Sequence, residues 1–282
     1  MEIRLASEPA PGHQNEDIVF AVAGFVGVLD GVTATVGVDN GCIHGPAWYV
    51  RQLARHLVRV NVVAPRASLA QMLSEAIESL RHDHRGQCDL DHPSTPAATV
   101  TLLRRHQDRA DYLVLCDSPL VIDRGSGAEV ITDDRFKHAV ATLRAKALAG
   151  GAAIGSDDHA QRVREAAVAK QQLVNQPDGY WIAASNPEAA QNAVIGSLAL
   201  RGSDALRRAA LLTDGASCIV EQFELLDWSQ LLDTLTDDGP QELIRRVRAA
   251  ETADSNGYAR PRYKRHDDAT AAICLFNDWK TQ

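Results

Sequence analysis

Three aspartates of this sequence share a local context that suits metal-assisted chemistry. Asp30 and Asp214 each follow an apolar, strand-like run, and Asp267 stands just before another. Gly31 and Gly215 come next after two of them, and glycine lets a backbone carbonyl or a ligand approach closely. Carboxylate and carbonyl oxygens are the ligands that Mg²⁺ and Mn²⁺ prefer, and two such ions can activate water and hold phosphate oxygens. An Asp–Gly pair after a strand is also a common turn, so each motif alone leaves both interpretations open.

The elements that must position these carboxylates follow from hydrophobic periodicity and from Gly and Pro punctuation. Strands are expected in residues 18–30 (two short ones), 98–103, 112–116, 119–123, 129–132, 206–213 and 269–276. Helices are expected in residues 47–63, 68–81, 136–149, 157–176, from 187 onward, and in two or three pieces of 216–253. Strands and helices come in separate groups, without regular βαβ alternation. This order disfavours a Rossmann-type sheet and favours an α+β fold with helices outside a β-sandwich.

Composition narrows the class of protein. The 282 residues are 45% hydrophobic and 23% charged, which is enough apolar material for a folded core. A formal net charge of −8 makes nucleic acid a poor partner. The five cysteines are scattered and odd in number, which is typical of a reducing compartment. Neither a signal peptide nor an apolar stretch of roughly 20 residues is visible, so we expect a cytoplasmic protein without a membrane contact.

Six short motifs occur in an order that is informative as a set. They are Asn15–Glu16–Asp17, Val28–Leu29–Asp30–Gly31, Thr99 with its strand, Cys116–Asp117–Ser118, Leu211–Leu212–Thr213–Asp214–Gly215 and Asp267–Asp268–Ala269–Thr270. In this order the chain resembles the 2C-type metal-dependent protein serine/threonine phosphatases, as a divergent, bacterial-like member. The resemblance implies a single domain over residues 1–282, built as a four-layer α-β-β-α sandwich of two antiparallel sheets flanked by helices. It also implies a variable flap-like segment around residues 150–190.

The same resemblance implies a metal centre with two Mg²⁺ or Mn²⁺ ions. Asp30 would bridge both ions, and Gly31 would offer its backbone carbonyl to one of them. Asp214 and Asp267 would complete the coordination of the other. Asp117 stands where bacterial members hold a third, weaker ion.

Around these ligands, Glu16 and Asp17 would bind waters held by the metals. The implied activity is hydrolysis of phosphoserine and phosphothreonine in a phosphorylated protein substrate. A hydroxide activated by the two metals would attack in line, without a phosphoenzyme intermediate.

The sequence departs from the family pattern around the substrate phosphate. Gly12 occupies the position of a frequent phosphate-binding Arg, and Val32 occupies the position of a His that some members use as general acid. Cys116 replaces the Gly of a G-D-S motif, and a Gly-rich insert follows Val32 through residue 45. The positive charge for the phosphate must therefore come from elsewhere.

The densest basic run of this acidic protein, residues 260–266, leads directly into Asp267. We predict that Arg262, Lys264 or Arg265 supplies the missing charge, with His13 as a weaker candidate. A solvated basic loop is the alternative for all of them.

Other interpretations remain open or are disfavoured. Leu29–Asp30–Gly31–Val32–Thr33 resembles the haloacid-dehalogenase motif D-x-D-G-T, but Val28 stands where that chemistry needs its nucleophilic Asp. A pseudophosphatase that binds phosphoproteins and an enzyme for small phosphate esters both stay possible.

The sequence also contains a short segment with three histidines and one cysteine. His82, His84, Cys88 and His92 lie close together, but the stretch between them is very polar and their spacing fits no closed zinc site. A loop is expected there.

Overall fold

The computed structural model describes residues 1–35, 37–84 and 86–276, and its core is a sandwich of two five-stranded sheets. One sheet has the order β1-β10-β9-β6-β7 and the other the order β2-β3-β4-β5-β8. All strand pairs in both sheets are antiparallel. The strands are β1 Glu2–Glu8, β2 Asp17–Val22, β3 Phe25–Gly31, β4 Ala98–His106, β5 Arg109–Leu115, β6 Leu120–Asp123, β7 Ala128–Ile131, β8 Val194–Ala199, β9 Arg208–Leu212 and β10 Ala269–Leu275.

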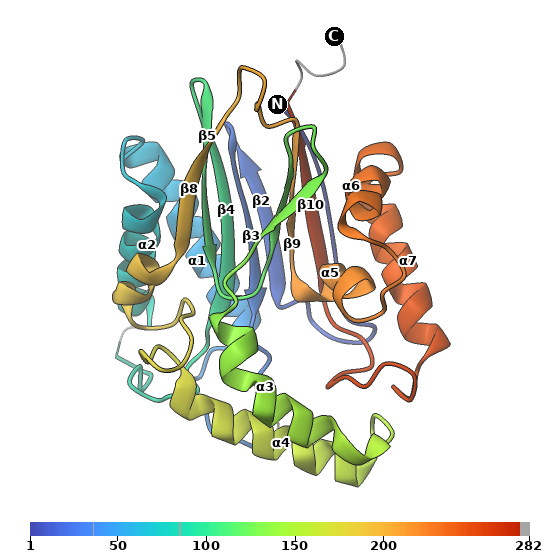
Figure 1. The fold of residues 1–282 in the computed structure, drawn as a ribbon. Coiled ribbons are helices and arrows are strands. Elements are labelled where there is room, and N and C mark those ends of the chain that lie inside the picture. The colour runs from blue at the N-terminus through green and yellow to red at the C-terminus, as the bar shows by residue number, and fades with distance from the viewer. Residues whose placement is uncertain (36, 85, 277–282) are drawn as a thin grey trace.

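Helices cover the outer face of each sheet, which gives the four layers seen in Figure 1. The helices are α1 Pro46–Val63, α2 Leu69–Asp83, α3 Arg135–Leu148, α4 Asp157–Lys170, α5 Asp214–Glu221, α6 Trp228–Asp237 and α7 Pro240–Ala253. Helices α1 and α2 pack on β3, β4 and β5, whereas α5, α6 and α7 pack on β9 and β10. The expected α+β sandwich with flanking helices is therefore confirmed.

Local sequence explains why these elements form where they do. Strand β3 is apolar almost throughout because it lies in the middle of a sheet with α1 on one face and the second sheet on the other. Helix α1 begins with Pro46, whose fixed φ suits the first helical turn. Helix α2 begins at a capping box in which Ser68 accepts from the backbone of Gln71.

The remaining helices lie at one end of the sandwich. Helices α3 and α4 form a hairpin that crosses the lower ends of the strands in Figure 1. Short 3₁₀ turns follow at Ala149–Gly151, Gln171–Leu173 and Pro187–Asn192. Among the described residues, no helix combines the length and the apolar character that crossing a bilayer requires.

The sequence-based assignment missed two strands. The first, β1, is an outer strand of the sandwich and carries polar residues among its apolar ones, so it gives a weak signal. The second, β8, contains Gly196 and is also an edge strand. The helix expected from residue 187 is only a 3₁₀ segment, and α4 ends at Lys170 rather than near residue 176.

Candidate functional site

Four aspartates from distant parts of the chain meet in one cavity at this end of the sandwich. Asp30 lies near the end of β3, Asp117 follows β5, Asp214 begins α5 and Asp267 precedes β10. All four side chains line a cavity of about 270 Å³. Both sheets contribute because β3 and β5 belong to one, whereas β9 and β10, next to Asp214 and Asp267, belong to the other. Sheet topology therefore assembles a set of oxygen ligands that no local motif contains.

The electrostatics of this cavity is unfavourable for carboxylates without a counterion. Burial, together with the neighbouring charge of Asp214, raises the pKa of Asp117 from 3.8 to about 6. The pKa of Asp267 also rises to about 6, because burial outweighs the opposing effect of Lys264. Burial and the charges of Asp17 and Asp214 raise the pKa of Asp30 well above its usual range. Crowded carboxylates in a cavity of this kind are stabilised by divalent cations, so the residues present fit Mg²⁺ or Mn²⁺.

Two glycines beside the cavity, Gly31 and Gly215, allow neighbouring backbone segments to approach closely. A Cβ atom at Gly31 would lie 2.6 Å from the carbonyl oxygen of Glu16, whose own position is fixed by a 3.0 Å hydrogen bond from the Gly31 N–H. A Cβ atom at Gly215 would lie 2.0 Å from the carbonyl oxygen of Asp268. Neither position has room for a side chain without a shift of the backbone.

The predicted supporting residues Glu16 and Asp17 lie behind the cavity wall. Asp17 is buried and stands opposite Asp30 in the β2–β3 pair, where its carboxylate accepts from the Thr213 hydroxyl at 2.9 Å. The Glu16 carboxylate accepts from the hydroxyl of Thr33, a residue of the cavity wall, at 2.6 Å. Both carboxylates are therefore next to the cavity without lining it.

Asp268 anchors the loop that carries Glu16. Its carboxylate is buried and accepts from the backbone N–H of Ala10 at 2.7 Å and of Glu16 at 2.6 Å. This carboxylate joins the segment before β10 to the segment between β1 and β2. The position therefore has a structural reason to be acidic in this chain.

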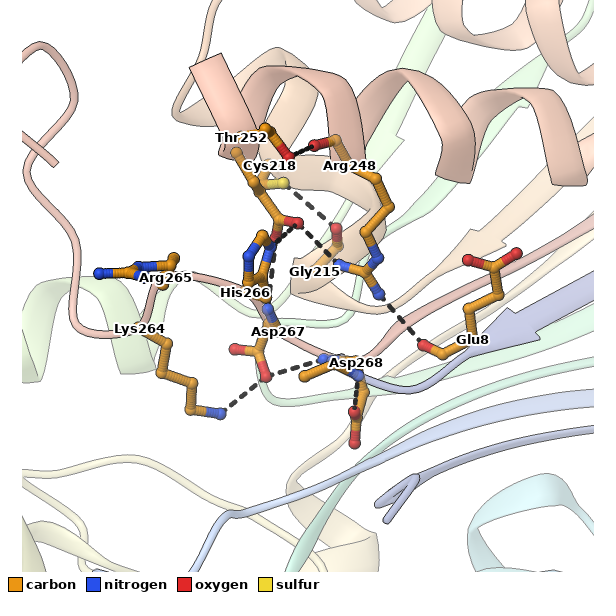
Figure 2. Close-up of polar contacts among 12 residues, drawn as sticks. Glu8, Gly215, Cys218, Arg248, Thr252, Lys264, Arg265, His266, Asp267 and Asp268 are labelled. Atoms are coloured by element: carbon orange, nitrogen blue, oxygen red, sulfur yellow. Dashed lines mark hydrogen bonds and ion pairs between the residues drawn. The ribbon is translucent and has the colours of Figure 1, made fainter. Parts of the chain in front are cut away.

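A second buried carboxylate holds the loop that carries Asp267. Glu251 is 3% exposed; it contacts His266 Nδ1 at 2.8 Å and accepts from the Arg248 guanidinium at 2.8 Å and the Asp267 N–H at 3.3 Å. Figure 2 labels Arg248, His266 and Asp267 and shows the Lys264 ammonium pointing toward the Asp267 carboxylate. The orientation of Asp267 is thus set by the backbone as well as by its ion pair.

The four basic residues predicted to bind phosphate lie in three different environments. Lys264 lines the cavity and donates to Asp267 at 2.7 Å and to Thr33 at 2.9 Å. Arg265 is exposed, is not part of the cavity wall, and points away from Asp267 in Figure 2. His13 is also exposed and outside the cavity wall.

Arg262 lines the cavity, but its guanidinium is committed elsewhere. The side chain is buried, forms an ion pair with Asp254 at 2.9 Å, and donates to the Asp254 backbone carbonyl at 2.6 Å. It also lies over the ring of Phe223, 5.3 Å from the centroid. These contacts are those of a residue that fixes the loop after α7.

A further lysine of the cavity was not predicted from the sequence. Lys170 is the last residue of α4 and lines the cavity, with its Nζ 5.6 Å from the centre of the Phe136 ring. Burial lowers the pKa of Lys170, and the nearby charge of Asp117 opposes that shift. No local pattern distinguishes this lysine from other surface residues of a polar helix; only the docking of α4 across the strand ends reveals it.

The residue before Asp117 has an unusual backbone. Cys116 adopts φ +69°, in the left-handed region that favours glycine. This conformation explains why a G-D-S pattern suits the turn after β5. Cys116 is buried, so its side chain packs in the cavity wall while its backbone presents Asp117.

Comparison with solved structures identifies the fold. The chain is similar to the PPM Ser-Thr phosphatase MsPP of Mycobacterium smegmatis, with 19% identity, 97% of each chain covered and a TM-score of 0.54. It is also similar to the Mycobacterium tuberculosis serine/threonine phosphatase PstP/Ppp, with 14% identity, coverage of 96% and 97%, and a TM-score of 0.58. Stp1, a serine/threonine phosphatase of Staphylococcus aureus, gives 14% identity, coverage of 97% and 94%, and a TM-score of 0.59.

Sequence comparison alone finds no relative: no family description and no curated protein matches this chain. The fold is that of the PPM-type, or 2C-type, serine/threonine phosphatases over nearly the whole chain. The resemblance read from the ordered motifs is confirmed at the level of the fold.

Proposed function

We propose that this chain is a metal-dependent phosphatase that hydrolyses phosphoserine and phosphothreonine in protein substrates. The observation that carries the proposal is the convergence of Asp30, Asp117, Asp214 and Asp267 on one cavity. A structural neighbour, PstP, was solved in complex with two manganese ions, which supports Mn²⁺ or Mg²⁺ as the cation. We place the protein in the cytoplasm as part of the same proposal.

Each carboxylate has a distinct part in this proposal. Asp30, near the end of β3, and the backbone carbonyl of Gly31 would contribute oxygen ligands to the metal ions. Asp214 and Asp267 would hold the second ion, and Asp117, beside Asp214, a third and weaker one. When bound, the ions would supply a water acidified enough to attack phosphorus at neutral pH and would neutralise phosphate oxygens.

Glu16 and Asp17 would orient waters of the metal centre from behind the cavity wall. Their carboxylates are held by hydroxyl donors of Thr33 and Thr213, so each has a fixed direction. A fixed direction matters because a carboxylate that aligns a water contributes only when it cannot rotate away.

Lys264 and Lys170 are the groups best placed to bind the substrate phosphate. Both residues line the cavity of the four aspartates and come from different segments, since Lys264 precedes β10 and Lys170 ends α4. A phosphate that enters with the metal ions would give Lys264 a second anionic partner besides Asp267. The phosphate-binding Arg that the family pattern places at residue 12 would then be replaced by lysines from other segments.

The α3–α4 hairpin would act as the cover of this site. Its residues Leu143, Val163, Ala166 and Ala167 give the cavity an apolar wall facing the acidic one. Exclusion of water on that side strengthens the electrostatic contacts of a bound phosphate. We propose that the flap predicted around residues 150–190, within one domain of residues 1–282, begins earlier and includes α3.

A catalytically weak phosphoprotein-binding module is the second candidate. The observation that favours it is the ion pair between Lys264 and Asp267, which occupies a proposed metal ligand at 2.7 Å. If that pair persists, Asp267 cannot ligate fully and phosphate would bind without turnover.

A substrate panel separates these functions. Phosphothreonine and phosphoserine peptides and p-nitrophenyl phosphate would each be incubated with Mn²⁺, Mg²⁺ or EDTA. Peptide turnover that EDTA abolishes supports the protein phosphatase, and turnover of the small ester alone indicates a different substrate class. Binding of the phosphopeptide without turnover, and without Mn²⁺ binding in calorimetry, would favour the binding module.

A further inference from the structure

A second group of metal-ligating side chains lies outside the carboxylate cavity. Cys42 and His44 come from the segment between β3 and α1, and His84 and Cys88 come from the segment at the end of α2. One ligand atom from each of these four residues lies within 4.8 Å of all the others. None of the four lines the carboxylate cavity.

The distances between these atoms suit a tetrahedral centre. The Nδ1 atom of His44 is 3.5 Å from the Sγ atoms of both Cys42 and Cys88. Bonds of about 2.3 Å to sulfur and 2.0–2.1 Å to nitrogen at tetrahedral angles separate S and N ligands by about 3.5 Å. The two sulfurs are 3.2 Å apart, closer than two zinc-bound thiolates but well beyond the ~2.05 Å of a disulfide.

His84 presents an unused nitrogen to this group. Its side chain is 2% exposed, and its Nδ1 lies 2.9 Å from the carbonyl oxygen of Leu80. A carbonyl can only accept, so Nδ1 carries the proton and Nε2 carries a lone pair. That Nε2 atom is buried without a hydrogen-bond partner among the described residues. A histidine that donates one ring N–H to a carbonyl and leaves the other nitrogen free is the usual arrangement at a metal.

The surrounding scaffold holds the four residues in place. The ring of Trp48 on α1 stacks on His44, with centroids 3.9 Å apart at 18°, and meets His84 edge-on at 4.9 Å. Beside the cluster, the N–H of Asp89 donates to the carbonyl of Gly41 at 2.7 Å, which joins the two segments directly. A Cβ atom at Gly41 would lie 2.6 Å from the Cβ of His92, so the close approach depends on glycine.

We propose that Cys42, His44, His84 and Cys88 bind one Zn²⁺ ion in a closed structural site. Thiolate and imidazole together select zinc over Mg²⁺ or Mn²⁺, and four protein ligands leave no open position for catalysis. The ion fastens the Gly-rich insert after Val32 to the end of α2.

The set of four proposed zinc ligands cannot be recognised from the sequence of either segment alone. His84 and Cys88 lie in the segment whose spacing fits no closed zinc site, and the two other histidines of that segment, His82 and His92, are not among the four proposed ligands. The His82 Nδ1 contacts the carbonyl of Glu78, and the His92 Nδ1 accepts from the Ser94 N–H. The other two ligands come from the insert more than 30 residues earlier in the chain, as a C-x-H pair.

The first test measures the zinc content of the full chain after purification without chelators from zinc-supplemented cells. We expect about one zinc per chain in the wild type and in Asp214→Asn, which alters the carboxylate cavity but leaves the thiolates intact. Cys88→Ser and His84→Ala should lose the zinc, whereas His82→Ala, a matched control outside the cluster, should keep it. Zinc lost from Asp214→Asn but kept in Cys88→Ser would overturn the proposal.

A second measurement uses the wild type alone, so that it does not depend on the folding of any variant. Replacement of zinc by Co²⁺ should produce thiolate-to-cobalt charge-transfer bands and the visible bands of tetrahedral Co²⁺. Absence of these bands, or a Cys42–Cys88 disulfide detected by mass in protein purified without air, would also overturn it.

Discussion

One energetic consequence of the carboxylate cavity concerns Asp117 in the metal-free protein. Its pKa of about 6, against an ordinary 3.8, means that the folded state resists ionisation of this side chain. The replacement Asp117→Asn keeps the shape and an acceptor oxygen but removes the charge. We therefore expect the variant to be more stable than the wild type in EDTA at pH 7.5.

The magnitude follows from the pKa shift. A shift of about 2 units corresponds to about 3 kcal/mol as an upper limit. The side chain is only partly buried, so solvent screening reduces the expected gain to roughly 1–2 kcal/mol. In a chain of this size that raises the Tm by roughly 2–4 °C.

The way in which the stability difference between Asp117→Asn and the wild type changes with pH provides a sharper test. An acid whose pKa is raised on folding costs nothing below its unfolded pKa, and its full cost is present above its folded pKa. The advantage of Asp117→Asn should therefore grow between pH 4 and pH 6 and stay level above. Saturating Mn²⁺ should shrink the advantage, because cations near Asp214 relieve the same repulsion.

Thermal unfolding in EDTA across this pH range, followed by circular dichroism, measures the effect. Asp178→Asn, at an exposed loop position, is the matched control and should change the Tm little. A variant that is no more stable than the wild type at pH 7.5, or whose advantage is equal at pH 4.5 and pH 7.5, would refute the electrostatic reasoning.

Three further predictions concern the residues around the cavity. Lys264→Ala should raise the KM for a phosphothreonine peptide by on the order of tenfold, about 1.4 kcal/mol, whereas Arg265→Ala should leave the KM unchanged. Equal changes of the KM in the two variants would show that Lys264 has no special position. Arg262→Ala should lower the free energy of unfolding in urea by about 3 kcal/mol, since it removes a buried guanidinium and leaves the half-buried Asp254 without its ion pair. Arg262→Lys should not restore this free energy, and an unchanged midpoint would show that these contacts contribute little. Gly215→Ala should weaken Mn²⁺ binding in calorimetry and lower the Tm, because the Cβ atom of the alanine would lie 2.0 Å from the carbonyl oxygen of Asp268. Normal Mn²⁺ binding would mean that the backbone at this position can shift without cost.

Much of the fold was predictable because its signals are local. The apolar run that became β2 and β3, the Pro at the start of α1 and the capping box of α2 each favour the observed element. The edge strand β8 was missed because an edge strand need not be apolar on both faces. Strand β1 was missed because its polar residues interrupt the apolar pattern.

The candidate site was predictable only in part, for a different reason. Asp30, Asp214 and Asp267 have recognisable neighbours in the sequence, so they could be proposed together before their convergence was visible. Lys170 has none, since its position depends on how the α3–α4 hairpin docks across the strand ends. The group of Cys42, His44, His84 and Cys88 could not be found from local spacing, because its members are divided between two segments that meet only in the folded chain.

The basic residues show the limit of charge patterns. Lys264 and Arg265 are exposed neighbours in the same basic run, yet only Lys264 lines the cavity. Arg262 lies in the same run and is tied to Asp254 instead. A run of charges therefore predicts a positive segment but not which side chain reaches a ligand.

The central claim is that the carboxylate cavity is a catalytic metal site. The most direct test is the rate of phosphothreonine-peptide hydrolysis as a function of Mn²⁺ concentration, for the wild type and for Asp214→Asn. We expect saturable, Mn²⁺-dependent turnover by the wild type and a loss of at least a hundredfold in the variant, about 2.7 kcal/mol. Turnover that does not depend on Mn²⁺, or that survives unchanged in Asp214→Asn, would contradict it.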